Sequence, residues 1–156
     1  MNSQQIRARL WDSLELQVLW ARFLISAIFI AVFILFCGIT RRNDYLNTWA
    51  VAGIIGGISL APLLIFCTIR TVKIFRKAES YIFCRTRLSQ PHSGPIRDTI
   101  YFTALFEDPA DGRKFPVDTH AIFTTWGSLL PRMDDYANSN VTLAYNQETG
   151  MVVVIG

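Results

Sequence analysis

Hydrophobic and polar positions divide the chain into two parts with different periods. Two uncharged stretches come first. The run FLISAIFIAVFILFCGIT fills the eighteen positions between Arg22 and Arg41, and TWAVAGIIGGISLAPLLIFCTI fills the twenty-two between Asn47 and Arg70. At about 1.5 Å per residue they give helices of roughly 27 and 33 Å, which match a hydrocarbon core of about 30 Å. We predict two transmembrane helices, at about 19–39 and 48–69.

Two other readings of these stretches are weaker. A buried core helix of a soluble protein would need a larger surrounding domain than the rest of the chain can form. A cleaved signal peptide fits poorly, because about 22 residues precede the first run and include Asp12 and Glu15, and no small-x-small cleavage site follows. We therefore expect an uncleaved helix.

From Tyr81 onward the pattern changes to the alternation of β-strands separated by turns. Five strands are predicted in YIFCRTRL, IRDTIYFTALFE, RKFPVDTHAIFTTW, VTLAY and MVVVI, with a short helix or helical turn within 127–140. The predicted fold class is a membrane protein of α+β type. A two-helix transmembrane hairpin and basic stem (1–80) precede a small mostly-β domain (81–156), a barrel or sandwich of about five strands. A flat sheet capped by the helix is the alternative.

Charge is distributed unevenly between these parts. Residues 1–80 carry nine Lys and Arg against four Asp and Glu, whereas residues 81–156 carry six against eight. Seven cations flank the outer ends of the two spans and two lie in the loop between them, which favours both termini in the cytoplasm. We predict a multi-pass protein of the inner (plasma) membrane. The basic part is not the folded domain, which argues against nucleic acid as a partner.

Three cations follow the second span at helical spacing. Arg70, Lys73 and Lys77 would share one side of a continuing helix, where they could contact anionic lipid headgroups. Alternatively, these cations only determine the orientation of the helices in the membrane.

Small residues recur every four positions inside the second span. Gly53, Gly57 and Ala61 form a strip at which another helix could approach closely. We expect the first helix of the same chain to pack there, or alternatively a second copy of the chain in a homodimer. Neither span holds an ionisable group in its middle, which argues against transport.

Residues that could take part in catalysis or bind a metal are few and scattered. Cys37, Cys67 and Cys84 are widely spaced, His92 and His120 have no companion at metal-ligand spacing, and the adjacent Asp134 and Asp135 make a poor acid–base pair. No nucleophile elbow or phosphate-binding glycine loop is present. We predict no enzyme activity, no metal and no cofactor.

The order of elements resembles that of a broad group of bacterial membrane proteins of unknown function. Two helices, a basic stem, YFTALFED, a DG turn and RKFPV precede VTLAYNQETGMVVVIG, whose Val141, Leu143, Tyr145 and Asn146 match a closing V-x-V-x-Y-N segment. Gln147 departs from the group, in which proline is more typical. The resemblance implies an architecture and a bacterial envelope, with no chemistry to carry over.

Two functions are compatible with these features. The first is a non-enzymatic, membrane-anchored interaction or scaffold module, with the bilayer and a membrane or envelope protein as partners. Aromatic residues at Tyr101, Phe106 and Trp126 would form its contact surface, unless they belong to the core. The alternative is an immunity-type protein that binds and neutralises a toxin at the envelope.

Overall fold

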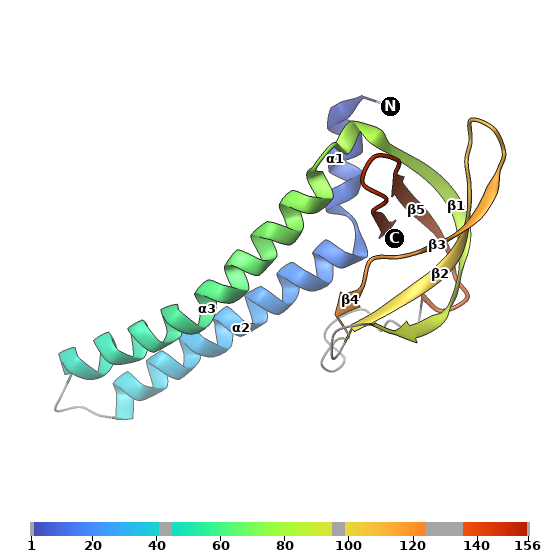
Figure 1. Ribbon diagram of the computed structural model, residues 1–156. Helices are drawn as coiled ribbons and strands as arrows, with labels where there is room; N and C mark the ends of the chain where they lie inside the picture. Colours follow the sequence, from blue (N-terminus) through green and yellow to red (C-terminus); the bar gives the residue numbers. More distant parts are fainter. Residues whose placement is uncertain (1, 41–44, 95–98, 124–135, 156) are drawn as a thin grey trace. The chain divides into compact units, whose positions relative to one another are not determined.

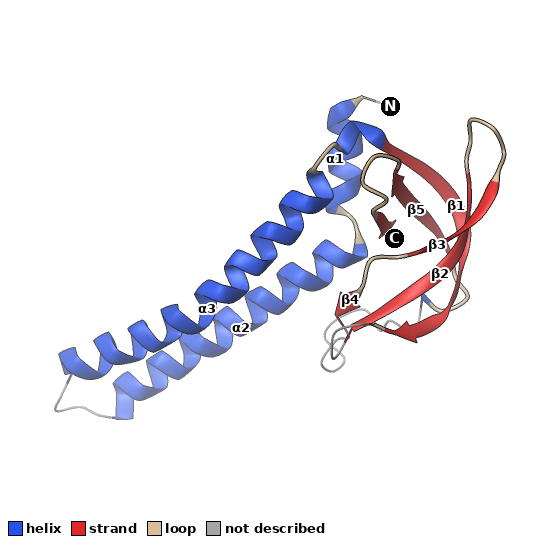
Figure 2. Cartoon of the chain, viewed as in Figure 1, coloured by secondary structure: helices blue, strands red, loops and turns tan. Residues whose placement is uncertain are grey.

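The computed structural model describes residues 2–40, 45–94, 99–123 and 136–155 (Figure 1). Its helices are α1 (Ser3–Trp11), α2 (Leu14–Thr40), α3 (Tyr45–Phe75) and the 3₁₀ turn η1 (Ala78–Ser80). The strands are β1 (Tyr81–Ser93), β2 (Thr99–Glu107), β3 (Lys114–Asp118), β4 (Ile122–Phe123), β5 (Asn140–Asn146) and β6 (Val152–Ile155) (Figure 2). The class is therefore α+β, as predicted. The short helix predicted within 127–140 falls largely outside the described residues.

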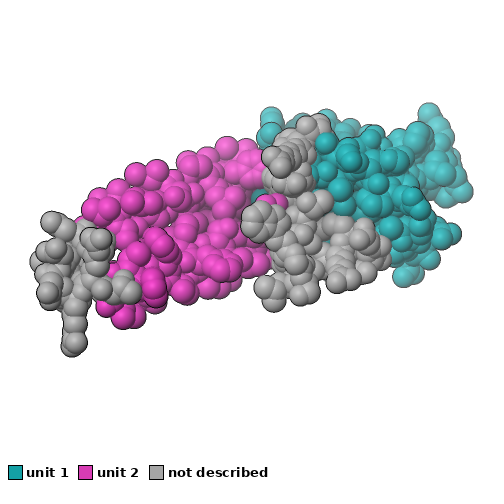
Figure 3. Space-filling model, turned by 90° about the horizontal axis from the view of Figure 1, so that it is seen from below, with its two compact units in different colours: residues 1–19, 71–156 teal, residues 20–70 magenta. Residues whose placement is uncertain are grey.

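The chain forms two compact units (Figure 3). One consists of Trp20–Arg70, and the other combines Met1–Leu19 with Thr71–Gly156. This division differs from the predicted boundary at residue 80, because the N-terminal segment belongs with the strands. We call the second one the sheet unit.

The unit of residues 20–70 is a pair of apolar helices. Within α2 and α3, the segments Leu14–Cys37 and Trp49–Phe75 are long and apolar enough to cross a membrane, and only 11% of each segment's most apolar window is buried. Of the nineteen large hydrophobic side chains that are exposed in the described residues, sixteen lie between residues 20 and 70. The two long apolar helices that the sequence predicts are thus present.

The sheet unit contains one antiparallel sheet with the order β3-β2-β1-β5-β6, and β4 also pairs with β2. Strand β1 has two partners. Its first half pairs with β5, from Tyr81↔Asn146 to Arg87↔Asn140, and its second half pairs with β2, from Leu88↔Ala104 onward. Pro91, which has no N–H to donate, lies where the register shifts after Leu88.

A barrel or sandwich of about five strands was predicted; the sheet is antiparallel and open, so it does not close into a barrel. No ladder joins β3 to β6 within the described residues; the link between the two ends is a single backbone bond, in which the His120 N–H donates to the Val152 carbonyl at 2.9 Å. The outer edge of β6 meets the N-terminal segment instead, through a bridge between Ser13 and Ile155.

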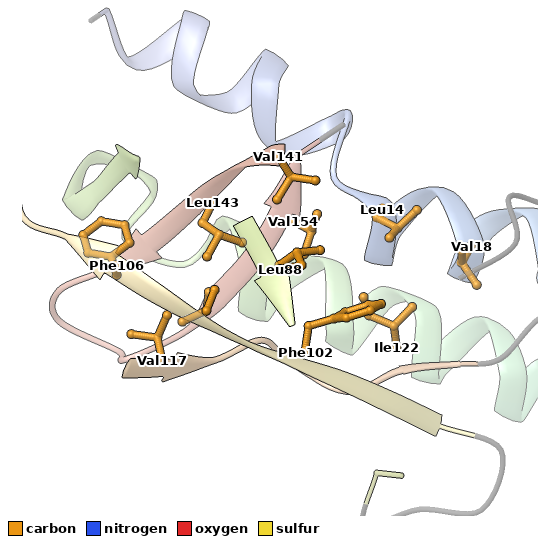
Figure 4. Close-up of a cluster of buried hydrophobic side chains, with 12 residues drawn as sticks. Leu14, Val18, Leu88, Phe102, Phe106, Val117, Ile122, Val141, Leu143 and Val154 are labelled. Atoms are coloured by element: carbon orange, nitrogen blue, oxygen red, sulfur yellow. The ribbon is translucent and has the colours of Figure 1, made fainter. Parts of the chain in front are cut away.

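The core lies on the inner face of this sheet. Phe102, Ala104 and Phe106 alternate along β2 and are buried, as the period of two predicts. They pack with residues of β1, β5 and β6, and with Leu14 and Val18 from the first turns of α2 (Figure 4). The start of α2 therefore completes the core.

Helix α1 fixes the N-terminal segment on the sheet unit. Its Ile6 and Leu10 are buried, while Arg7 and Trp11 are exposed. The Gln5 side chain accepts a hydrogen bond from the Asn2 N–H at 3.3 Å, which satisfies one of the free donors at the helix start. This helix was not predicted from the sequence.

Candidate functional site

The junction between α3 and the sheet is organised by one buried amide, Asn146. Its Nδ2 donates to the carbonyl oxygens of Lys77 at 3.0 Å and Arg76 at 3.4 Å, just beyond the end of the helix. Its Oδ1 accepts from the N–H groups of Glu148 and Thr149, both at 3.0 Å. We call these five residues the Asn146 junction. It ties the end of a long apolar helix to the β5–β6 turn.

The main chain turns sharply at this junction. Helix α3 ends at Phe75, and Lys77 has a φ of 53°, in the left-handed region. On the other side, Gly150 has a φ of 68° and donates its N–H to the Asn146 carbonyl at 2.8 Å. Glycine adopts this conformation at no steric cost, which explains the residue type.

An ion pair closes the surface of the junction. The Lys77 ammonium and the Ser80 hydroxyl both donate to the carboxylate of Glu148. These hydrogen bonds lower the pKa of Glu148. Lys77 therefore lies outside the helix on which it was predicted, and its charge is directed to Glu148. This corrects the predicted trio of lipid-contacting cations, because Lys77 does not share a helical face with Arg70 and Lys73.

The two other cations of that trio lie within α3. Arg70 is half-buried, with its guanidinium 5.7 Å from the centre of the Phe66 ring, and Lys73 is exposed. Near the helix end, the half-exposed Trp11 ring packs against Phe75 at 5.1 Å between ring centres. Contact of Arg70 and Lys73 with anionic lipid stays a prediction.

The close helix approach uses a different glycine from those predicted. A Cβ added at Gly56 would lie 2.7 Å from Cγ2 of Ile30 and 3.2 Å from Cδ1 of Ile34, whereas one at Gly53 or Gly57 would meet nothing within 4 Å. Gly53, Gly57 and Ala61 are exposed on α3. The strip is thus not the contact between α2 and α3, and its use against a second copy stays a prediction.

The predicted aromatic surface is not assembled by the described residues. Phe106 is fully buried, with its ring centre 5.6 Å from that of Phe115 and 5.2 Å from that of Tyr145. Tyr101 is half-buried beside His92, at 5.4 Å between ring centres, and Trp126 lies outside the described residues. Phe106 is therefore a core residue, which corrects its assignment to a contact surface.

A polar group near the start of α2 was not predicted from the sequence. Glu15, in the first turn of α2, is buried, and its Oε1 lies 3.8 Å from Nε2 of His120. The positive end of the helix dipole favours a carboxylate at this position. Burial raises the pKa of Tyr81 to about 12, and the charge of Glu15 adds to the rise. These residues are far apart in sequence, so no spacing rule could have brought them together.

The described residues contain no group of three or more His, Cys, Asp or Glu side chains placed to hold a metal ion. Their three cysteines are free thiols, at positions 37, 67 and 84. The predicted absence of enzyme activity and of cofactors stays a prediction. Compared with protein families, curated proteins and solved structures, the chain matches none of them.

Proposed function

We propose that this protein is a non-enzymatic, membrane-anchored interaction or scaffold module that holds its sheet unit at the cytoplasmic face of a bacterial inner membrane. The observation that carries the proposal is the apolar surface of residues 20–70. Phe29, Phe33 and Ile39 are 71%, 60% and 76% exposed there. Removal of apolar surface from water stabilises a protein by about 25 cal/mol per Å². An apolar surface of this extent therefore favours lipid as its surroundings.

The sheet unit supports a hairpin topology. The N-terminal segment before the first apolar helix and the strands after the second belong to this one unit, and Ser13 pairs with Ile155 within it. A compact body that contains both flanking segments fits two membrane crossings with both ends on one side. The excess of cations at those ends favours the cytoplasm.

Topology can be tested by cysteine labelling in a variant without native cysteines. Thr149→Cys, at an exposed position of the sheet unit, should react with an impermeant maleimide only after the inner membrane is permeabilised. Asn43→Cys, in the loop between the predicted spans, should react as soon as the outer membrane is opened. The reverse pattern would place the sheet unit in the periplasm.

The partner can be captured by photo-crosslinking in native membranes. Leu105, which is 59% exposed on the outer face of β2, is a suitable position for a photoreactive residue, and the same residue at Gln147 is a matched control. Enrichment of one membrane protein at position 105 alone supports the module, whereas a tightly co-purifying toxin would support the immunity-type alternative. No specific capture from any exposed position of the sheet unit would contradict both.

A further inference from the structure

Two arginines of β1 line an open pocket on the sheet unit. The pocket has a volume of about 550 Å³ and is lined by Arg85, Thr86, Arg87 and Asn140. Arg85 and Arg87 are separated by one residue and therefore project from the same face of the strand. Asn140 is the direct pairing partner of Arg87 on β5, so the two side chains leave the sheet on the same face.

These two cations differ from the other cations that the structure describes in the same part of the chain. Four of the six Lys and Arg residues in 81–156 lie within the described ranges. Arg113 pairs with Asp111, and Lys114 pairs with Glu107 at 3.1 Å. Neither Arg85 nor Arg87 has an ion pair with a described residue, although acidic residues outnumber basic ones in 81–156. Two neighbouring guanidinium groups repel each other unless an anion lies between them.

The geometry of Arg87 is fixed by the main chain. Its Nε donates to the carbonyl oxygen of Asn138 at 2.9 Å, and Asn138 has a φ of 58° in the turn before β5. This bond leaves the two terminal nitrogens of the guanidinium available as donors. A side chain that is held in place loses less entropy when it binds a ligand.

We propose that Arg85, Arg87 and Asn140 form a binding site for a phosphate monoester. Guanidinium groups bind phosphate oxygens through paired hydrogen bonds. The two positive charges of Arg85 and Arg87 match the double negative charge of a phosphate monoester better than the single charge of one carboxylate. The pocket volume lies within the range of small-ligand sites. The ligand is either a soluble phosphorylated compound or the headgroup of a lipid such as phosphatidic acid. The site does not rest on the proposed scaffold function.

The test uses the full chain in neutral detergent micelles. Binding of inorganic phosphate and of a short-chain phosphatidic acid is measured by isothermal titration calorimetry at constant ionic strength, with short-chain phosphatidylglycerol and succinate as comparison ligands. We expect saturable binding of phosphate, of phosphatidic acid, or of both. Binding of phosphate, with or without phosphatidic acid, supports a soluble ligand, whereas binding of phosphatidic acid alone assigns the site to lipid.

Substitutions assign the binding to the pocket. Arg85→Gln and Arg87→Gln should each weaken it at least about tenfold, because each removes charge-assisted hydrogen bonds. Arg87→Lys keeps the charge but loses the bond to Asn138, and it should weaken binding as well. Arg113→Gln is the matched control, since it removes one exposed charge elsewhere, and it should have no effect.

Three results would overturn the proposal: no saturable binding of either phosphate compound, an equal loss of affinity in Arg113→Gln, or tighter binding of succinate than of phosphate. The Arg85 side chain makes no hydrogen bond within the described residues and is exposed, so Arg85→Gln should keep the wild-type circular dichroism spectrum. A loss of phosphate binding in that variant is then not a loss of folding.

Discussion

Replacement of Asn146 by alanine should destabilise the sheet unit more than its single amide suggests. The side chain is fully buried and makes four hydrogen bonds to the main chain of the other junction residues. Alanine leaves two main-chain carbonyl groups at the end of α3 and two N–H groups in the β5–β6 turn without these partners. The turn itself is exposed, so water can replace the bonds to its N–H groups.

The size of the effect follows from these four bonds. Each contributes about 1 kcal/mol net, and a buried polar group left unsatisfied costs about 1–3 kcal/mol. With partial compensation by water on the turn side, we expect a loss of about 3 kcal/mol in the free energy of unfolding. At a urea dependence of about 1.5 kcal/mol per M, the midpoint should fall by roughly 2 M.

The assay is a urea titration of the full chain in neutral detergent, followed by near-ultraviolet circular dichroism. Gln147→Ala, an exposed amide at the next position, is the control and should change the free energy by no more than about 0.5 kcal/mol. Asn146→Asp keeps the acceptor oxygen but directs negative charge at the Lys77 carbonyl. Its folded-state pKa should be raised, so this variant should gain stability as the pH falls through that value.

Equal urea midpoints for Asn146→Ala and Gln147→Ala would contradict this prediction. An equal loss of stability in Asn146→Ala and Asn146→Asp at every pH would also contradict it. Either result would mean that the end of α3 is held by packing rather than by this amide.

Three further predictions concern single positions of the two units. Tyr81 has a pKa of about 12 in the folded protein and about 10 in the unfolded chain, so it contributes about 2–3 kcal/mol of stability below pH 10 that is lost as the pH rises to 12. Tyr81→Phe should remove this alkaline loss of stability. Urea midpoints of both proteins at several alkaline pH values measure the difference. Gly56→Ala should destabilise the helix pair by about 1–3 kcal/mol in a dodecyl sulfate titration, whereas Gly53→Ala should not, and equal effects would contradict the assigned contact. Phe106→Ala should cost about 3–5 kcal/mol of unfolding free energy by urea titration, and Leu105→Ala no more than about 0.5; a mild Phe106 variant would speak against its place in the core.

The sequence is most informative where a pattern is local and periodic. Uncharged runs of eighteen and twenty-two residues are sufficient to predict two long helices, and the alternation along Phe102, Ala104 and Phe106 predicts which face of β2 is buried. These features depend on the geometry of one segment alone. The predicted DG turn, Asp111-Gly112, likewise contains Gly112 with a φ of 68°.

The features that escaped prediction depend on contacts between distant segments. No local pattern shows that Leu14 and Val18 complete a core made by strands that follow residue 80, or that Glu15 lies near His120. The helical spacing of Lys77 was misleading because α3 ends before it, where Asn146 binds the freed carbonyl groups. An aromatic residue such as Phe106 is compatible with either a contact surface or the core, and only the fold decides between them.

The pairing of Ser13 with Ile155 has a consequence for synthesis. The sheet unit recruits residues from before and after the two apolar helices, so its last strand emerges from the ribosome only after both helices have done so. Until then the N-terminal segment has no sheet edge to join, and Leu14 and Val18 have no core to enter. Assembly of this unit therefore requires that both apolar helices have already been synthesised.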